Sequence, residues 1–271
     1  MEHKYKVLNH GFLNLVDHMG SDDAIVTAAR VSYGQQNKSK EEDRKLIRYL
    51  MKHRHTSPFE MCEVKLHVKL PIFVARQWVR HRTASLNEIS GRYSVLNADQ
   101  YIPKTFRKQS QSNKQGSSEE SVEYTIGSYD KSVTEYQKML NLDISKEISR
   151  IVLPLATYTE WYWKIDLHNL FHFLKLRLAP NAQQEIREYA QKIAIIVKDL
   201  FPISWEAFED YMLNSVNFSA NELECLSKIL NNECSCKKKD KQDPLEGAKL
   251  TAREKKEFQH KIKIIKRIGK P

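Results

Sequence analysis

The chain has 271 residues, of which 41% are hydrophobic and 10% aromatic. This composition excludes a disordered protein and leaves room for one large folded domain or two small ones. No apolar run approaches the ~18 residues of a membrane-spanning helix, and the first residues lack the apolar core of a signal peptide. We therefore expect a cytoplasmic protein that does not bind membranes.

The formal net charge of +10 is distributed unevenly. Residues 237–271 contain 13 Lys or Arg against five acids, whereas the rest of the chain is nearly balanced. An excess of positive charge can serve nucleic acid or small anionic ligands. Because most of the excess lies in one terminal segment, the pattern argues against a nucleic-acid-binding body and favours a chain without a nucleic-acid partner.

The N-terminal half predicts both helices and strands. A helix is expected over 21–31 with Ser21 as its N-cap, and a second over 41–52. Residues 63–70 alternate strictly between apolar and polar side chains, which predicts a half-buried strand. Pro71 ends this strand and can occupy the first turn of a helix over 72–82.

The next part of the chain predicts mainly helix. Residues 107–120 are polar and low in complexity, which predicts an exposed loop. Residues 121–141 favour a helix, the strongly apolar stretch 157–178 predicts one long helix, and 182–200 predicts another before Pro202. The fold class is therefore α+β, a helix-rich subunit with a mixed or antiparallel sheet.

The last 51 residues differ in character from the rest, so we divide the chain into a domain over 1–220 and a basic extension over 221–271. Thr251 and Glu254 form a capping-box pattern, and apolar residues at helical spacing then predict a short amphipathic helix that packs on protein. The extension also carries Cys225, Cys234 and Cys236. Their spacing permits a zinc site, but no CxxC pair accompanies them, so we favour reduced thiols and expect no metal.

The segment Arg80 to Ser94, RHRTASLNEISGRYS, concentrates the polar chemistry and predicts a polar loop that binds anions. Arg80 and Arg92 offer planar forks of donors for a phosphate or a pyrimidine carbonyl, and Ser90 with main-chain N–H groups near Gly91 can complete a phosphate cradle. A surface loop with salt bridges is the alternative. It accounts for single arginines better than for the whole string, because closely spaced like charges destabilise a protein without bound anions.

The same string resembles the signature RHRxxSxNExSxRY of flavin-dependent thymidylate synthases at every fixed position. Further likeness comes from HxSPFE at 55–60, PIFVARQW at 71–78, SRIVLP at 149–154 and FLKLRLAPNAQQEIR at 173–187. The resemblance covers about residues 5–212. It implies an α+β homotetramer that makes dTMP from dUMP, with methylenetetrahydrofolate as carbon donor and FAD, reduced by NADPH, as hydride source.

The resemblance also assigns residues. It implies that Arg177 polarises the uracil ring as the catalytic arginine, that Ser90 and Arg92 bind the nucleotide phosphate, and that Arg150 reaches the nucleotide from a neighbouring subunit. The full dUMP set that it implies is Gln77, Trp78, Val79, Arg80, Glu88, Ile89, Ser90, Gly91, Arg92, Arg150 and Arg177. The FAD set is Ser57, Arg80, His81, Arg82, Glu88, Asp166, Leu167, His168 and His172.

Three features of the sequence itself bear on the assigned residues and on the flavin. Gln77, Arg80 and His81 stand at i, i+3 and i+4, so a continuous helix would place them on one face. A histidine on an apolar helix can equally be a satisfied core residue. No GxGxxG or Walker A sequence supports the flavin independently, so FAD rests on the resemblance. Two further classes remain open: a nucleic-acid-binding protein and a structural oligomer with a decayed site.

Overall fold

The computed structural model describes residues 4–32, 34, 39–111, 116–127, 129–234, 245 and 250–268. Contacts divide the chain into two compact units, residues 1–213 and residues 214–271. The first unit carries all the strands of the described residues, which are β1 (Lys4–Val7), β2 (Gly11–Met19), β3 (Glu63–Pro71), β4 (Ser85–Glu88), β5 (Phe106–Gln109), β6 (Ser117–Val122) and β7 (Tyr158–Asp166).

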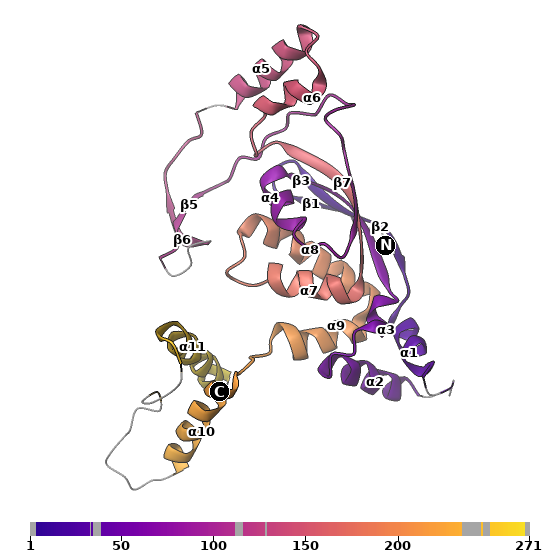
Figure 1. Ribbon diagram of the computed structural model, residues 1–271, viewed down its shortest axis with the longest axis vertical. Helices are drawn as coiled ribbons and strands as arrows, with labels where there is room; N and C mark the ends of the chain where they lie inside the picture. The colour runs from indigo at the N-terminus through magenta and orange to yellow at the C-terminus, as the bar shows by residue number, and fades with distance from the viewer. Residues whose placement is uncertain are drawn as a thin grey trace. The chain divides into compact units, whose positions relative to one another are not determined.

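The helices of the first unit are mostly short and lie between these strands or follow them (Figure 1). They are α1 (Asp22–Arg30), α2 (Lys40–Lys52), α3 (Ser57–Glu60), α4 (Ile72–Trp78), α5 (Asp130–Asn141), α6 (Lys146–Ser149), α7 (Leu167–Arg177), α8 (Gln184–Leu200) and α9 (Pro202–Phe208), with a 3₁₀ turn η1 (Arg150–Val152) and a π-helical turn η2 (Glu209–Leu213). The second unit contains α10 (Ala220–Cys234) and α11 (Ala252–Ile268).

The main sheet has the order β1-β2-β3-β7-β4, and all its pairs are antiparallel. The predicted strand over 63–70 is confirmed as β3, with its alternate residues from Val64 to Leu70 fully buried. Helices α7 and α8 cover one face of this sheet (Figure 1). The α+β prediction, with an antiparallel sheet, is therefore correct.

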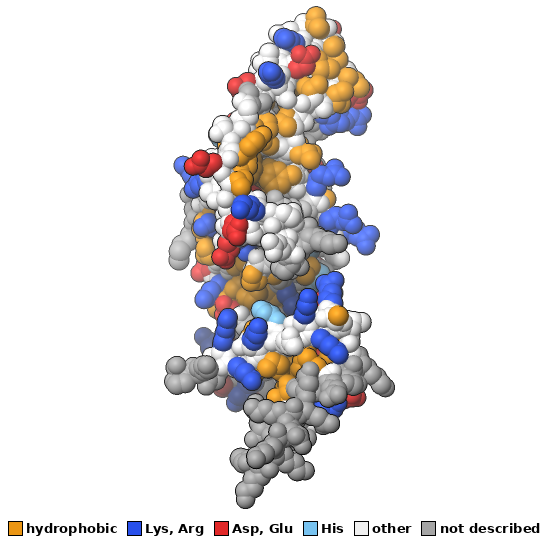
Figure 2. Space-filling model, turned by 90° about the vertical axis from the view of Figure 1, so that its left-hand side faces the viewer, with side chains coloured by type: hydrophobic (Ala, Val, Ile, Leu, Met, Phe, Trp, Pro, Cys, Tyr) orange, Lys and Arg blue, Asp and Glu red, His pale blue; other side chains and the backbone are white. Residues whose placement is uncertain are grey.

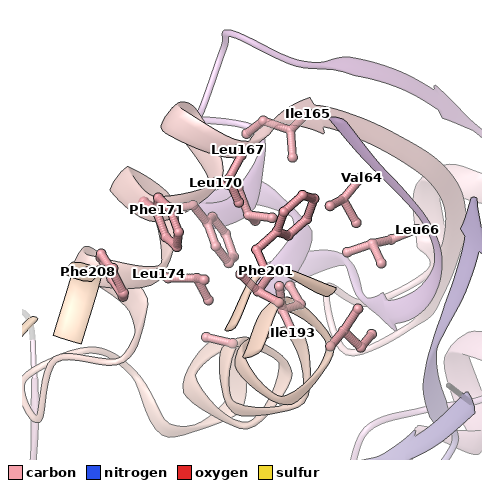
Figure 3. Close-up of a cluster of buried hydrophobic side chains, with 14 of the residues drawn as sticks. Val64, Leu66, Ile165, Leu167, Leu170, Phe171, Leu174, Ile193, Phe201 and Phe208 are labelled. Atoms are coloured by element: carbon pink, nitrogen blue, oxygen red, sulfur yellow. The ribbon is translucent and has the colours of Figure 1, made fainter. Parts of the chain in front are cut away.

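The core lies between the sheet and these two helices. Leu167 and Leu170 of α7 lie on the side of Val64 and Leu66 of β3, whereas Leu174 lies nearer Phe208 (Figure 3). All three leucines and both strand residues are fully buried. At ~25 cal/mol per Å², burying a leucine or valine side chain contributes about 1.5–3 kcal/mol, so α7 is held firmly against the sheet. This packing also fixes the positions of the residues directly before and after α7.

The prediction of one long helix over 157–178 is wrong, because its first half is the strand β7. In the segment YTEWYWKID, Trp161, Trp163 and Ile165 are buried at every second position, while Tyr162 between them is exposed. That period of two belongs to a strand, and aromatic residues favour strands. Asp166 then caps α7 by accepting from the main-chain N–H of Asn169 at 2.9 Å.

The segment before β7 also needs correction. The exposed loop predicted over 107–120 contains parts of the hairpin strands β5 and β6, with residues 112–115 outside the described residues. The helix predicted over 121–141 begins only at Asp130. The helix predicted over 72–82 ends at Trp78, whereas the helices predicted over 21–31, 41–52 and 182–200 are confirmed within two residues.

Candidate active site

The arginine-rich segment runs from the end of α4 along the edge of the main sheet. Its middle, Ser85–Glu88, is not a loop as predicted but the edge strand β4, which pairs with β7 from Ser85↔Lys164 to Glu88↔Trp161. The predicted shared helical face of Gln77, Arg80 and His81 does not exist, because α4 ends before Arg80. Pairing with β7 instead fixes where the two ends of the segment lie.

One end of the segment forms a cavity of about 350 Å³, which we call the Arg177 pocket. The side chain of Arg177 is held there by two neutral acceptors. Its Nε donates to Nε2 of His81 at 3.2 Å, and its NH2 donates to the main-chain oxygen of Gln77 at 3.0 Å. The residues that line the pocket are Arg80, His81, Arg82, Thr83, Ile165, Asn169, His172, Leu176 and Arg177.

The electrostatics of the Arg177 pocket follow from burial. Desolvation, with added repulsion from Arg177 and His172, lowers the pKa of His81 from 6.5 to about 4, so this imidazole is neutral at pH 7 and can accept from Arg177. Burial also lowers the pKa of Arg177 from its ordinary value. In the described parts of the chain no carboxylate lies within 4.0 Å of Arg177. A partly buried, unpaired guanidinium of this kind favours a ligand that carries negative charge or polarised oxygens.

Two further arginines stand at the mouth of the same pocket. Arg80 and Arg82 are exposed, and among the residues that the structure covers neither forms an ion pair. Thr83 adds a hydroxyl group. Guanidinium groups and hydroxyl donors are suited to phosphate oxygens. This donor set therefore fits a phosphate-bearing cofactor such as FAD.

The other end of the segment forms a second cavity of about 310 Å³, which we call the Ser90 pocket. Here Gly91 allows a close approach. A Cβ atom at this position would lie 2.8 Å from Cδ1 of Leu96 and 3.0 Å from Cδ of Arg150. The pocket is lined by Ile72, Glu88, Ile89, Ser90, Gly91, Leu96, Arg150, Leu153, Tyr158 and Thr159.

Two arginines of the predicted site lie differently with respect to the Ser90 pocket: Arg150 lines it and Arg92 does not. Arg150 lies beside Gly91 of its own chain, and the expectation that it reaches the nucleotide of a neighbouring subunit stays a prediction. Arg92 is exposed and is not among the lining residues. Its Nε lies 3.6 Å from a carboxylate oxygen of Glu147, and its main-chain N–H donates to Oγ of Ser90 at 3.3 Å.

Comparison with known proteins decides the family. Residues 14–203 match the family model described as thymidylate synthase complementing protein. A flavin-dependent thymidylate synthase from Thermus thermophilus is 56% identical over 232 residues, which cover 84% of this chain and 86% of the relative. The chain belongs to the flavin-dependent thymidylate synthases. It is therefore an enzyme of nucleotide biosynthesis that uses a flavin, as the signature implied.

Other members and structures agree. The flavin-dependent thymidylate synthase of Treponema denticola is 52% identical over 241 residues, which cover 85% of this chain and 91% of the relative. The crystal structure of a UMP/dUMP methylase from Streptomyces cacaoi bound with 5-Br dUMP superposes with a TM-score of 0.69 at 33% identity, covering 77% of this chain and 99% of that one. The fold seen here is thus shared with a nucleotide methylase.

Within this family fold, the remaining dUMP residues occupy different environments. Trp78 is fully buried in the core, so only its main chain can meet a ligand. Val79 is exposed, and the side chain of Gln77 donates to that of Gln183. Glu88 accepts from the hydroxyl of Thr159, and the main-chain N–H of Ile89 donates to the oxygen of Glu160 at 2.9 Å.

Four of the five predicted flavin residues outside the signature lie on α7 or at its N-cap. His172 lines the Arg177 pocket, whereas the buried side chain of Leu167 faces the core. Asp166 caps the helix, His168 is half-buried, and neither is among the residues that line the pocket. Ser57 is exposed at the first position of α3.

The sequence interpretation missed Asn169, which lines the Arg177 pocket one helical turn before His172. The i, i+3 spacing of these two residues is the signal that would have found it. Thr83 and Ile165 were missed as well, and Ile165 carries no chemical signal of its own.

The thiol of Cys62 has no thiolate character. Cys62 is fully buried, its Sγ lies 3.6 Å from the main-chain oxygen of Ser21, and burial raises the pKa of its thiol to about 11. Nucleophilic attack requires a thiolate. Cys62 therefore does not serve as an attacking nucleophile, in keeping with the flavin route. Cys225 is buried in the second unit, and the side chain of Cys234 and all of Cys236 lie outside the described residues.

Proposed function

We propose that the Arg177 pocket and the Ser90 pocket together form the active site for thymidylate synthesis. As a member of its family, the chain converts dUMP to dTMP with methylenetetrahydrofolate as carbon donor and with FAD, reduced by NADPH, as cofactor. The flavin, when bound, supplies the hydride, and the protein supplies orientation and charge. The observation that carries the proposal is the partly buried guanidinium of Arg177, which has only neutral partners in the described chain.

Arg177 is assigned the catalytic role. Its guanidinium is oriented before any ligand binds, by His81 on one side and Gln77 on the other. Placed against N3 and O2 of uracil, it stabilises the negative charge that develops on the ring during attack from C5. Preoriented donors of this kind contribute about 3–4 kcal/mol to the transition state, because they need no reorganisation during the reaction.

The Ser90 pocket is assigned to the phosphate of dUMP. Ser90 offers a hydroxyl, the main chain near Gly91 offers N–H groups, and Arg150 offers a guanidinium that lies close because residue 91 has no side chain. Arg92 is one residue away and can exchange its long contact with Glu147 for the phosphate. Glu88 also lines the pocket, but its carboxylate accepts from the hydroxyl of Thr159, and among the described residues no hydrogen bond joins Ser90 to a base. We therefore assign Ser90 binding and not nucleophilic attack.

The flavin is assigned to the mouth of the Arg177 pocket and the start of α7. Arg80, Arg82 and His81 face its phosphates and ring, and His172 completes the pocket. Leu167 contributes main chain only. Ser57, Glu88, Asp166 and His168 are proposed as further contacts to the cofactor.

The distance between the two pockets supports a site shared between copies of the chain. The Ser90 pocket is lined by Thr159 and the Arg177 pocket by Ile165, six residues apart on β7. At ~3.3 Å per residue the separation is about 20 Å, longer than a uridine mononucleotide. We propose that dUMP lies between the Ser90 pocket of one copy and the Arg177 pocket of another, in a homotetramer.

The rest of the organisation follows from this assignment. We propose that residues 1–220 carry the catalytic function and that 221–271 are an extension. No helix among the described residues is long and apolar enough to span a membrane. We propose that the enzyme works in the cytoplasm.

The purified protein tests the assignment directly. We expect an oxidised-flavin absorption spectrum that bleaches on addition of NADPH, and release of tritium from C5-labelled dUMP when methylenetetrahydrofolate is present. A correctly assembled protein that takes up neither FAD nor dUMP would contradict the proposal. Binding of both without tritium release would contradict the catalytic assignment alone.

A further inference from the structure

The C-terminal unit has a small core of its own, which thymidylate synthesis does not explain. Phe258 of α11 is 1% exposed and packs with Cys225 of α10, while Ile262 lies against the same cluster. Lys261 donates to both carboxylate oxygens of Glu222 at 2.7 Å, which ties the two helices together. The matched family model ends at residue 203, before this unit begins.

The face of α11 opposite this core carries a continuous row of basic side chains, which we call the basic stripe. Its five members are separated by three, four, three and four residues, so they follow one line along the helix. All five are exposed. The 14 steps from the first to the last of these residues correspond to about 21 Å at ~1.5 Å per residue. The stripe consists of Arg253, Lys256, His260, Lys263 and Arg267.

Most charges of the stripe lack an ion-pair partner within the described part of the chain. Arg253 forms an ion pair with Glu257 at 2.8 Å. Among the described residues, Lys256, Lys263 and Arg267 form none within 4.0 Å. Like charges three and four residues apart repel one another and destabilise a helix. A bound polyanion relieves this repulsion, which is why the row favours an anionic partner over plain solvation.

The apolar side of α11 decides between two kinds of anionic surface. A helix that lies on a membrane inserts its apolar face into the lipid. Here Phe258 and Ile262 already face α10, and among the described residues of α11 Ile265 is the one large apolar side chain that is exposed, at 41%. The exposed part of the helix is therefore mainly charged and polar, and the basic stripe runs along it. Figure 2 shows Lys and Arg side chains gathered over this helix. A row of separate cations along a straight helix matches the repeated phosphates of a nucleic-acid backbone.

We propose that the basic stripe of α11 binds the phosphate backbone of nucleic acid without reading its sequence. This revises the expectation that the chain has no nucleic-acid partner, and it is independent of the proposed active site. DNA and RNA offer the same phosphate chemistry, and the experiment distinguishes them. The whole unit contains 14 Lys or Arg against eight acids, so its field attracts polyanions as well.

The test measures binding of the full-length protein to a labelled 20-base-pair DNA duplex and to a labelled 20-nucleotide RNA, by fluorescence anisotropy at several KCl concentrations. The triple variant K256Q/K263Q/R267Q removes three stripe charges. The control K40Q/K131Q/K198Q removes three exposed lysines from helices of the first unit. Both variants should retain the flavin spectrum and thymidylate synthesis of the unaltered enzyme.

For at least one of the two nucleic acids, we expect the stripe variant to bind at least tenfold more weakly than the unaltered protein at 50 mM KCl. The slope of log K against log [KCl] should fall by about 2–3, at ~0.7–0.9 per phosphate contact. The control should stay within twofold. Three outcomes would overturn the proposal: no saturable binding to either nucleic acid at 50 mM KCl, equal weakening in both variants, or tighter binding to phosphatidylserine vesicles than to nucleic acid.

Discussion

The two pockets at the ends of the arginine-rich segment differ in how they hold their cations. In the Arg177 pocket the guanidinium is partly buried and is oriented by His81 and a main-chain oxygen. In the Ser90 pocket Arg150 is exposed, and Arg92 has only a long contact with Glu147. Preorganised charge lowers a reaction barrier, whereas adaptable charge serves binding. The first pocket should therefore control kcat and the second KM for dUMP.

Replacing Arg177 tests this division with the largest effect. R177A should lower kcat by about 10²–10³-fold, since loss of one preoriented donor costs ~3–4 kcal/mol. R177K should remain impaired, because an ammonium group cannot keep both donors of the fork. Tritium release from C5-labelled dUMP measures the rate, and the flavin spectrum should persist. R76A, which removes an exposed arginine on α4, is the control. Normal turnover by R177A would refute its assigned role.

The Ser90 pocket is best tested at Gly91. G91A places a methyl group 2.8 Å from Leu96 and 3.0 Å from Cδ of Arg150, so both side chains must shift and Arg150 loses its present position in the pocket. We expect dUMP to bind about tenfold more weakly, a loss of ~1.4 kcal/mol, with kcat little changed. Titration calorimetry measures the dissociation constant. G127A is a matched control because a Cβ atom there meets nothing within 4 Å. Equal affinity in G91A and the unaltered enzyme would mean that Arg150 does not bind the nucleotide.

Acidification should reveal the neutral histidine of the Arg177 pocket. Burial lowers the pKa of His81 to about 4 in the folded protein, against 6.5 in the unfolded chain, so the unfolded state binds more protons between these values. This contribution to stability is therefore present above pH 6.5 and is lost as pH falls towards 4. The Tm of the unaltered protein should drop more between pH 7.5 and 5 than the Tm of H81N. Parallel drops would show that His81 titrates normally.

Cys62 should give the smallest effect on turnover. Its thiol is buried and its pKa is about 11, so C62A should keep kcat within twofold while the free energy of unfolding falls by about 1 kcal/mol. Turnover and thermal unfolding measured on the same preparation separate the two effects. Loss of turnover in a folded C62A protein would indicate that a thiolate of Cys62 takes part in the reaction. That result would contradict the flavin route.

Strict patterns in the sequence were the ones that predicted structure correctly. The alternation over 63–70 predicted β3, and the capping box at Thr251 is formed, with Glu254 accepting from the main-chain N–H of Thr251 at 2.7 Å. The helix predicted over 157–178 was wrong because the prediction relied on the high content of apolar residues and not on the period at which they recur. Trp161, Trp163 and Ile165 alternate in β7, but tryptophan and isoleucine are compatible with a buried helix as well.

The candidate active site, too, could be predicted from the sequence only in part. The spacing of the signature identified the arginines, but which of them share a pocket depends on the pairing of β4 with β7, from Ser85↔Lys164 to Glu88↔Trp161. That pairing is tertiary, so the sequence around residues 80–94 does not contain it. The same reason applies to Asn169. Because α7 begins directly after β7, the pairing of β7 in the sheet also determines that Asn169 lines the Arg177 pocket.

The measurement that tests the account most directly combines two defective variants in one assembly. R177A disables one pocket, and the double variant S90A/R150A disables the other. The two chains are coexpressed with different tags, assemblies that carry both tags are purified, and tritium release is measured at dUMP below its KM. If the site unites the Arg177 pocket of one copy with the Ser90 pocket of another, some sites combine two intact halves and the mixed assembly regains turnover. A mixed assembly no more active than either parent would show that both pockets of one site belong to the same chain.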